Sequence, residues 1–361
     1  MKFAALALVA GLLAVASPSA GSPAGVLRLR PSSSVAVPHL YDGLVADAGR
    51  VAVVGSPCGI GLWRPGKPTP SFIRACRSTP RDWGSGIDGV ALAGQRLAWI
   101  REESVSHGSR VQTDLVVKAG SGKPRVIASG YIDLFANVGT QLFSLRGAGS
   151  TLAFGWESHT TDPNGVVDTD ERVYRLARAA SEPGTDTCPG QNDLVSNPPP
   201  ARLCTNTGHY VSTVESVSQG RLLVSSGNND AAIVEPDNKA HNLSIPFRWE
   251  IDDLALSGTN VIVVRADSTT VEIYDAESGT RLHRWPIARA SSLKGLSVDS
   301  RFAVFEARGF HLVRLSDGSE KTLLAPGGTR PIDVALDSSG LFVLYRTHGR
   351  TRLGFVPLAR L

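Results

Sequence analysis

The segment Leu254–Val264, LALSGTNVIVV, holds the pattern that decides the fold. Two short apolar runs flank a turn of small and polar residues, and the second run, Val261–Val264, is continuously apolar. A strand of this composition is typically buried on both faces. The segment therefore predicts a pair of strands whose second member lies inside a packed β structure.

The same pattern occurs seven times along the chain. Aligned on the first apolar residue after the turn, the copies lie at Val51, Leu97, Leu152, Leu222, Val261, Phe302 and Leu341. The last four copies are 39 to 41 residues apart, and the earlier intervals are 46, 55 and 70 residues. A period of roughly 40–45 residues is expected of a propeller blade. Two alternating segments with a hairpin turn follow the pair in regular copies, as in Val271–Ile287, so a full repeat is expected to supply four strands.

These repeats predict an all-β chain that forms a single β-propeller of seven four-stranded blades. The composition agrees, because 37 Gly and 22 Pro with one Met favour many short strands joined by turns. The last repeat offers only three strands before residue 361. We expect an N-terminal strand, within residues 26–30 or 34–37, to complete the last blade as its outer strand, which would remove an exposed sheet edge. The alternative is a disordered linker.

The repeat resembles the WD40-like and TolB-like propeller repeats of exported bacterial proteins. The resemblance covers about residues 40–361 and consists of apolar spacing with a small-residue turn. The segment Val271–Trp285, VEIYDAESGTRLHRW, also resembles one quinoprotein-type blade. However, the docking tryptophans of quinoproteins, an adjacent cysteine pair, and the Trp-Asp and Gly-His signatures of true WD40 blades are missing. The resemblance implies a fold and no particular activity.

The N-terminus has the pattern of a secretory signal peptide, with Lys2 before the apolar run Phe3–Ala16. We assign residues 1–20 to the signal and residues 21–361 to the propeller, and the alternative is an uncleaved anchor or a buried segment. No other stretch approaches the roughly 20 apolar residues of a membrane span. The protein is therefore expected to be secreted, in a periplasmic or extracellular location, with no membrane span after signal cleavage.

Four cysteines, an even number, suggest disulfides in an exported chain. Their spacing favours two local pairs, Cys58 with Cys76 and Cys188 with Cys204, although other connectivities or unpaired thiols are alternatives. Cys58 and Cys76 are equidistant from Lys67 in a turn, so they are expected to face each other across a hairpin. Cys188 and Cys204 lie in an insertion at about residues 179–209, which is either a functional excursion or a tolerated surface loop. No CxxC or His pair supports a metal site.

Three connections in blades one to three are expected to share the face of the propeller where ligands usually bind. They are residues 77–83, 101–107 and 156–162. The candidate ligand-binding residues on them are Arg81, Trp83, Glu102, Glu103, His107, Trp156, Glu157, His159 and Asp162. Tryptophans could stack on a ligand, paired carboxylates could act as acid and base, and Glu with His could hold a metal. The alternative is that these are solvated loop residues.

No catalytic signature occurs, since G-x-S-x-G, H-E-x-x-H and phosphate-binding motifs are absent. We therefore assign no catalytic residue, metal or cofactor. The net charge of +4 is scattered, so no nucleic-acid partner is expected. The leading hypothesis is a monomeric binding scaffold for a protein or a cell-envelope polymer. One alternative is a propeller hydrolase or lyase that uses loop carboxylates, and a third is an electron-transfer or quinone enzyme.

Overall fold

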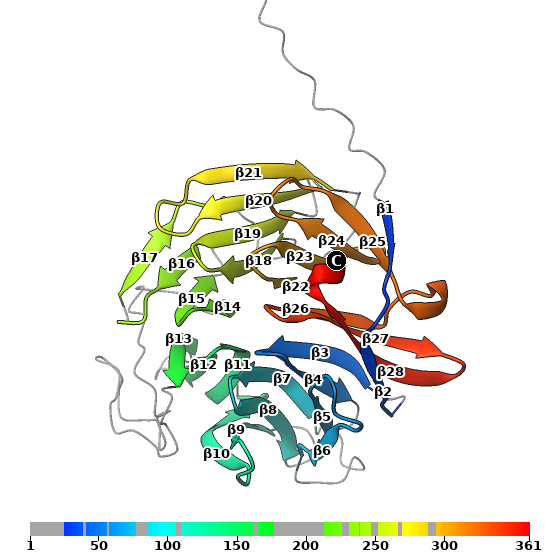
Figure 1. Ribbon diagram of the computed structural model, residues 1–361. Coiled ribbons are helices and arrows are strands. Elements are labelled where there is room, and N and C mark those ends of the chain that lie inside the picture. Colours follow the sequence, from blue (N-terminus) through cyan, green and yellow to red (C-terminus); the bar gives the residue numbers. More distant parts are fainter. Residues whose placement is uncertain are drawn as a thin grey trace, which may run out of the picture.

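The computed structural model shows groups of short β-strands arranged around a central channel, each group beside the next (Figure 1). The structure describes residues 25–38, 41–55, 58–76, 86–105, 110–136, 138–161, 165, 167–176, 213–225, 231–237, 239–246, 252–265, 269–287 and 294–361. Besides strands, these ranges contain two short 3-10 turns, η1 (Pro326–Gly328) and η2 (Leu358–Arg360). The prediction of an all-β protein with a single propeller is confirmed.

Five of the hydrogen-bonded sheets in the described ranges have four or five strands. The first contains β3 (Tyr41–Asp47), β4 (Arg50–Gly55), β5 (Gly59–Trp63) and β6 (Ser71–Arg74). The second contains β14 (Thr213–Ser218), β15 (Arg221–Ser225), β16 (Ala231–Val234) and β17 (Ala240–Leu243). The third contains β18 (Asp252–Ser257), β19 (Asn260–Arg265), β20 (Thr270–Asp275) and β21 (Arg281–Pro286).

The other two sheets of this size each include a strand from the N-terminal segment. One contains β22 (Lys294–Val298), β23 (Phe302–Glu306), β24 (Phe310–Arg314), β25 (Glu320–Leu324) and, beside β25, β1 (Gly25–Arg28). The other contains β26 (Asp333–Asp337), β27 (Gly340–Thr347), β28 (Arg350–Pro357) and, beside β28, β2 (Ser33–Ala36).

The sixth sheet is larger and corrects the expected division into seven separate blades. It contains β7 (Gly86–Ala93), β8 (Arg96–Val105), β9 (Arg110–Ala119), β10 (Arg125–Asp133), β11 (Val138–Ala148), β12 (Thr151–Thr161) and β13 (Val167–Leu176). Only five sheets therefore have the size of one blade. The reason is the short pairing of β10 with β11, at Ile132↔Gly139 and Asp133↔Val138, which joins the second and third repeats into one sheet.

The N-terminal segment pairs with two different sheets. β1 runs parallel to β25, and β2 runs antiparallel to β28, with Val35 opposite Leu353. Leu29 and Val35 are buried in the clusters that these sheets form. Both stretches that the sequence offered as outer strands are thus paired, one to the last sheet and one to the sheet before it. Closure of the ring by this segment remains a prediction, tested below.

The second strand of each repeat is buried, as its apolar sequence predicts. Val261 and Val263 in β19 have no exposed surface, and neither does Leu341 in β27. The buried clusters lie between neighbouring sheets, so each inner strand is covered on both faces. No helix in the described ranges is long and apolar enough to cross a membrane. The predicted signal peptide, residues 1–20, lies outside the described residues.

The Cys58–Cys76 disulfide is present, which confirms one of the two predicted bridges. The Cα atoms are 5.6 Å apart, within the usual range. Gly59 pairs with Arg74 in the β5–β6 ladder, and the Ala75 amide donates to the Cys58 carbonyl at 2.9 Å, so the bridge lies one residue out of direct opposition. Cys188, Cys204 and the insertion lie outside the described residues.

Removing this bridge by Cys58→Ser with Cys76→Ser is expected to lower the free energy of unfolding by about 3 kcal/mol, because the open chain gains loop entropy. Chemical denaturation of the double variant and the wild type measures the difference. Equal midpoints with equal slopes would show that the bridge adds no stability.

Candidate functional site

Four of the nine predicted ligand-binding residues lie outside the described residues: Arg81, Trp83, His107 and Asp162. The other five are placed on two strands. Glu102 and Glu103 lie in β8, and Trp156, Glu157 and His159 lie in β12.

The expectation that these five residues occupy loops is wrong. Glu102 pairs with Thr113 in β9, and Glu157 pairs with Glu171 in β13, so both segments are regular antiparallel strands. In the sequence, the charged and polar residues of these two segments suggested loops. They are compatible with strands here because other side chains of the same sheet pair with them, as Gln141 and His159 do with the largely buried Glu157.

The structure gives the described carboxylates separate partners. The Glu157 carboxylate lies 2.8 Å from the His159 Nε2 atom, and Glu103 lies 3.9 Å from the Arg101 guanidinium. Burial raises the pKa of Glu102, and the neighbouring charge of Asp88 raises it further. β8 and β12 are separated by three strands in the order of the sheet, and Glu102, Glu103 and Glu157 are absent from the described lining of the channel.

Trp156 is a core residue. Its side chain is 1% exposed and packs edge-on against Tyr174, with ring centroids 6.5 Å apart. The ring therefore offers no open face for stacking on a ligand.

The channel is surrounded by β3, β7, β11, β14, β18, β22 and β26, each of which contacts the next within the described part of the chain (Figure 1). Side-chain oxygens connect this ring by accepting backbone N–H groups of other repeats. The pairs are Asp47 with Gly94 (2.8 Å) and Gly149 (3.0 Å), Ser144 with Val214 (3.0 Å), Ser218 with Gly258 (3.0 Å), Asp253 with Leu296 (2.9 Å), Ser297 with Leu336 (2.9 Å), Asp333 with Leu44 (2.6 Å) and Asp337 with Gly49 (2.7 Å).

The channel is a cavity of about 810 Å3 with an acidic lining. Its described charged residues are Asp47, Arg146, Glu215, Asp253, Asp299, Asp333 and Asp337. Burial raises the pKa of Asp47, Glu215 and Asp253, and the charge of Arg146 opposes this rise for the last two. The Arg146 Nε atom donates to the Glu215 carbonyl at 3.1 Å, which places the cation among these carboxyls.

The raised pKa values predict how stability depends on pH. A carboxyl whose folded pKa is raised contributes stability that is complete below its ordinary pKa and is lost as the pH rises through the folded value. We therefore expect the melting temperature to fall as the pH is raised above about 5, beyond the ordinary carboxyl range. Glu215→Gln should weaken this dependence, because a neutral amide avoids the cost of burying a charge.

Calorimetry across this pH range measures the effect, with Asp317→Asn as the control. The pKa of Asp317 is lowered by hydrogen bonds from Ser319, so its change should leave the slope above about pH 5 unaltered. A slope that is the same in wild type and Glu215→Gln would contradict the assignment.

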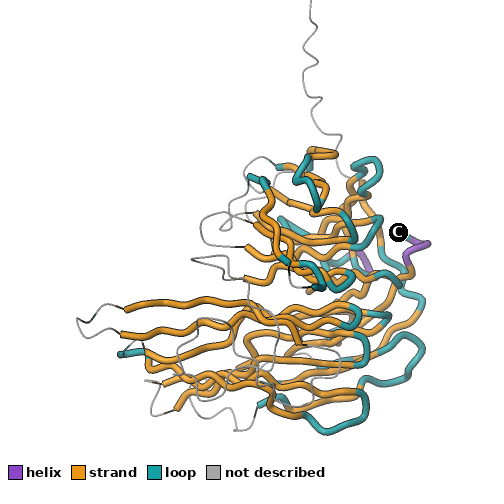
Figure 2. The backbone as a smooth tube through the Cα atoms, turned by 90° about the vertical axis from the view of Figure 1, so that its left-hand side faces the viewer, coloured by secondary structure: helices purple, strands orange, loops and turns teal. Residues whose placement is uncertain are grey.

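The seven-stranded sheet projects beyond the rest of the ring (Figure 2). Its strands β8 to β13 have nine to eleven residues, whereas strands of the other sheets have four to eight. Inside the projection, Asp114 accepts two hydrogen bonds from Arg101, at 2.6 and 3.0 Å, and one from Ser129 at 2.6 Å. These bonds hold the pKa of Asp114 below its ordinary value although burial opposes them.

Four exposed apolar side chains gather where β10 turns into β11. Tyr131, Leu134, Phe135 and Val138, here called the hairpin patch, are half of the eight large apolar side chains that are exposed in the described residues. Phe135 is 88% exposed. Exposed apolar side chains that are grouped in this way are typical of an interaction site.

The hairpin patch is held in a defined conformation. The Asp133 carboxylate accepts the amide protons of Phe135 and Ala136, at 3.0 and 3.1 Å, which fixes the turn. Arg110 bonds the same carboxylate at 3.0 Å and lies over the Tyr131 ring, 5.9 Å from its centroid. Leu134 and Phe135 therefore stand on a hydrogen-bonded stretch of the chain directly after β10.

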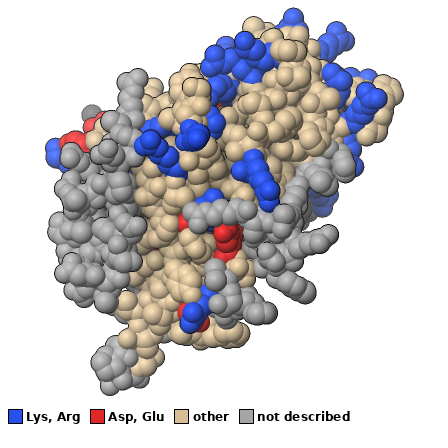
Figure 3. Space-filling view, turned by 90° about the horizontal axis from the view of Figure 1, so that it is seen from below, with Lys and Arg blue, Asp and Glu red and all other residues tan. Residues whose placement is uncertain are grey.

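Charge is distributed in separate groups on the face in Figure 3, where Lys and Arg are more prominent than Asp and Glu. The drawn side chains of this face form no continuous basic stripe. In the described residues, no group of three or more His, Cys, Asp or Glu side chains is arranged to hold a metal ion.

Comparison with known proteins supports the fold. No family model and no curated protein matches the chain. Among solved structures, one described as YCF48 bound to D1 peptide has a TM-score of 0.53 and 11% identity, covering 93% of this chain and 99% of that one. The WD40 β-propeller domain of Doa1 has a TM-score of 0.50 and 12% identity, covering 91% and 98%. The chain resembles WD40 β-propellers in fold.

Sequence reasoning missed the hairpin patch and the channel carboxylates. Asp47, Asp299 and Asp337 stand beside the repeated turn, so their position in the repeat was a usable signal. Phe135 carried no such signal, because one aromatic residue between two apolar segments is equally compatible with a core position.

Proposed function

We propose that this protein is an exported, monomeric binding scaffold that takes a protein partner on the projecting sheet. The observation that carries the proposal is the hairpin patch, with an aromatic side chain exposed on a turn fixed by Asp133 and Arg110. Aromatic anchors with a neighbouring arginine are typical of the residues that dominate binding energy at interfaces. The apolar chemistry of the patch favours a protein partner over a cell-envelope polymer.

The proposal also includes seven blades. The seven-stranded sheet would then be a four-stranded blade, β7–β10, fused to a three-stranded one, β11–β13. The ring of seven channel-lining strands in the described residues supports this division. The fusion would keep the projecting sheet rigid, because β10 and β11 share backbone hydrogen bonds next to the patch.

Export is supported by the signal-like N-terminus and the Cys58–Cys76 bridge. A peptide-binding role is supported by the YCF48 structure, which is described with a bound peptide. The alternative of a hydrolase that uses the loop carboxylates receives less support, since Glu103 and Glu157 each lie beside a cationic or imidazole partner.

Replacement of Leu134 and Phe135 by Ser is expected to abolish capture of the partner and to leave the melting temperature unchanged, because both side chains are exposed. Affinity capture from an extract of the native cell envelope, followed by mass spectrometry, measures this. Phe72→Ser is the matched control, because Phe72 is 51% exposed on β6, in a different sheet. Equal recovery of the same proteins by both variants and the wild type would overturn the proposal.

A further inference from the structure

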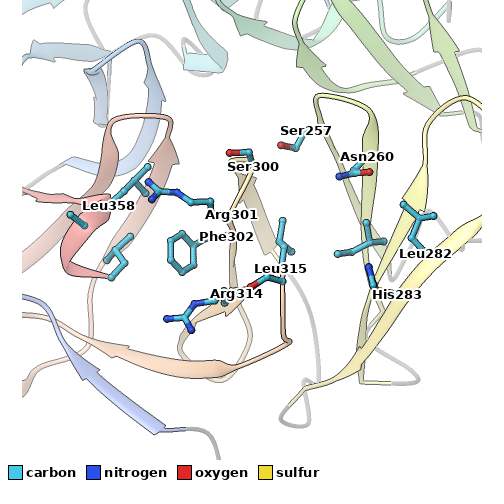
Figure 4. Close-up of a pocket in the computed structure, with 14 residues that line it drawn as sticks. Ser257, Asn260, Leu282, His283, Ser300, Arg301, Phe302, Arg314, Leu315 and Leu358 are labelled. Atoms are coloured by element: carbon cyan, nitrogen blue, oxygen red, sulfur yellow. The ribbon is translucent and has the colours of Figure 1, made fainter.

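A second cavity, of about 530 Å3, lies away from the hairpin patch. It spans the end of the β22–β25 sheet, between the β18–β21 sheet and the turn η2 (Figure 4). Its volume is in the range of small-molecule sites, roughly 300–1,000 Å3. Arg301 and Phe302 lie toward the end of the cavity that Leu358 lines, Ser300 lies between the two ends, and Leu282 and His283 line the opposite end.

Arg301 has different partners from the arginines that stand at the equivalent position in other repeats. Arg50, Arg96 and Arg221 occupy the same place, directly before the buried second strand. Each of these three donates to a backbone carbonyl in the turn of the following repeat: Gly94, Ser150 and Gly258, respectively. These arginines therefore serve to join neighbouring repeats.

Arg301 makes no corresponding bond to the following repeat in the described residues. Its closest ion-pair partner is Asp299, at 4.0 Å, and the Asp299 carboxylate already accepts the amide protons of Arg301 and Phe302, at 2.9 and 2.6 Å. The guanidinium lies over the Phe302 ring, 5.9 Å from its centroid, at the cavity. At the equivalent position in three other repeats the arginine joins two repeats. The Arg301 guanidinium instead lies at the cavity.

Arg314 places a second cation at the same end of the cavity. It pairs with Phe302 across the β23–β24 ladder, so the two side chains share one face of the sheet. Figure 4 shows Arg301 and Arg314 on the two sides of Phe302, with both guanidinium groups extended in the same direction. The nearest carboxylate to Arg314 is the half-exposed Asp317, at 3.2 Å.

The other end of the cavity carries mainly apolar side chains. Ile273, Leu282 and Leu315 line it together with the polar Asn260 and with His283, whose ring stacks on Trp285 with centroids 5.5 Å apart. A ligand that fills the whole space therefore needs an apolar body at one end and an acidic group at the other.

We infer that this cavity binds a small amphiphilic anion, with an acidic head held by Arg301 and Arg314 and a hydrocarbon or aromatic body against Leu282 and Leu315. Guanidinium groups bind carboxylates and phosphates in fork-like, charge-assisted hydrogen bonds. Desolvation of the apolar body supplies the remainder of the affinity. This site is separate from the proposed protein-binding surface, so each can fail without the other.

Isothermal titration with sodium octanoate tests the inference, with acetate as the head alone and octan-1-ol as the chain alone. Octanoate should bind at one site, more tightly than either, and added salt should weaken it. The Arg301→Gln, Arg314→Gln variant should bind octanoate at least tenfold more weakly, since it loses both charges. Arg308→Gln is the matched control: it is exposed in the same sheet, between β23 and β24 at their other ends.

The imidazole proton signals of His283, identified with a His283→Gln variant, supply a local measurement. They should shift on octanoate addition in wild type and Arg308→Gln. Unchanged melting temperatures will show that the arginine variants are folded. Equal octanoate affinity in wild type and the double variant, absence of saturable binding, or binding without a His283 shift would overturn the inference. So would binding to vesicles of phosphatidylglycerol without binding to free octanoate, because that result assigns the cations to a membrane surface.

Discussion

Deletion of residues 25–38 is expected to lower the melting temperature by about 10 °C or more. The deleted segment buries Leu29, Val35 and Val37, and each buried apolar side chain is worth about 1.5–3 kcal/mol. It also removes the β1–β25 and β2–β28 pairings and leaves two sheet edges unpaired. A loss of about 5 kcal/mol corresponds to a shift of this size, at roughly 2 °C per kcal/mol for a large domain.

Single substitutions test whether the buried side chains of this segment account for its contribution to stability. Val35→Ala should destabilise by about 1–2 kcal/mol, because Val35 packs in a buried cluster with Leu353. Val26→Ala in β1 should change stability by less than about 0.5 kcal/mol, because Val26 is 62% exposed. Scanning calorimetry measures both. A deletion variant that melts at the wild-type temperature would exclude a role in closing the ring.

Asp47→Ala is expected to destabilise the protein by about 2–4 kcal/mol. The Asp47 carboxylate accepts the amide protons of Gly94 and Gly149, in the turns of the second and third repeats, so its loss leaves two donors unpaired. Asp47→Asn keeps one acceptor oxygen and should cost about half as much. Urea denaturation curves give these differences.

Asp237→Ala is the control for this experiment. Asp237 is an exposed turn residue whose carboxylate accepts the amide proton of Lys239 within its own hairpin, so its loss should cost less than about 0.5 kcal/mol. If Asp47→Ala were no more destabilising than Asp237→Ala, the hydrogen-bonded ring would not hold neighbouring repeats together.

The repeat architecture could be predicted because burial dictates its sequence. A strand covered on both faces must be apolar throughout, as Val261–Val264 is, and the turn before it needs small or polar residues. The hairpin position of Cys58 and Cys76 followed from their distance to one turn. These features depend on local sequence, which is why they could be derived without a structure.

The projecting sheet could not be predicted in this way. β8 and β12 continue into residues such as Glu102 and His159, whose polarity is equally suited to loops and to solvent-facing strands. The pairing of β10 with β11 depends on two residue pairs across a turn, a contact that periodicity does not encode. The different role of Arg301 emerges only when the partners of Arg50, Arg96 and Arg221 are known.

The channel and the hairpin patch differ in the environment of their side chains. In the channel, the carboxylates of Asp253, Asp333 and Asp337 accept backbone amide protons of neighbouring repeats, which suits them to holding the ring together. The patch side chains, in contrast, are exposed on a turn that is itself fixed by hydrogen bonds. This contrast supports the proposal that a partner protein binds at the outer edge of the ring.

Site-specific photo-crosslinking tests that placement most directly. A benzophenone amino acid in place of Phe135, introduced into the protein in its native cells, should give a discrete adduct with one partner protein. The same probe in place of Phe72, which is also exposed but lies on β6, should not give that adduct. The absence of an adduct from position 135, or the same adducts from both positions, would contradict the assignment of the hairpin patch as the binding surface.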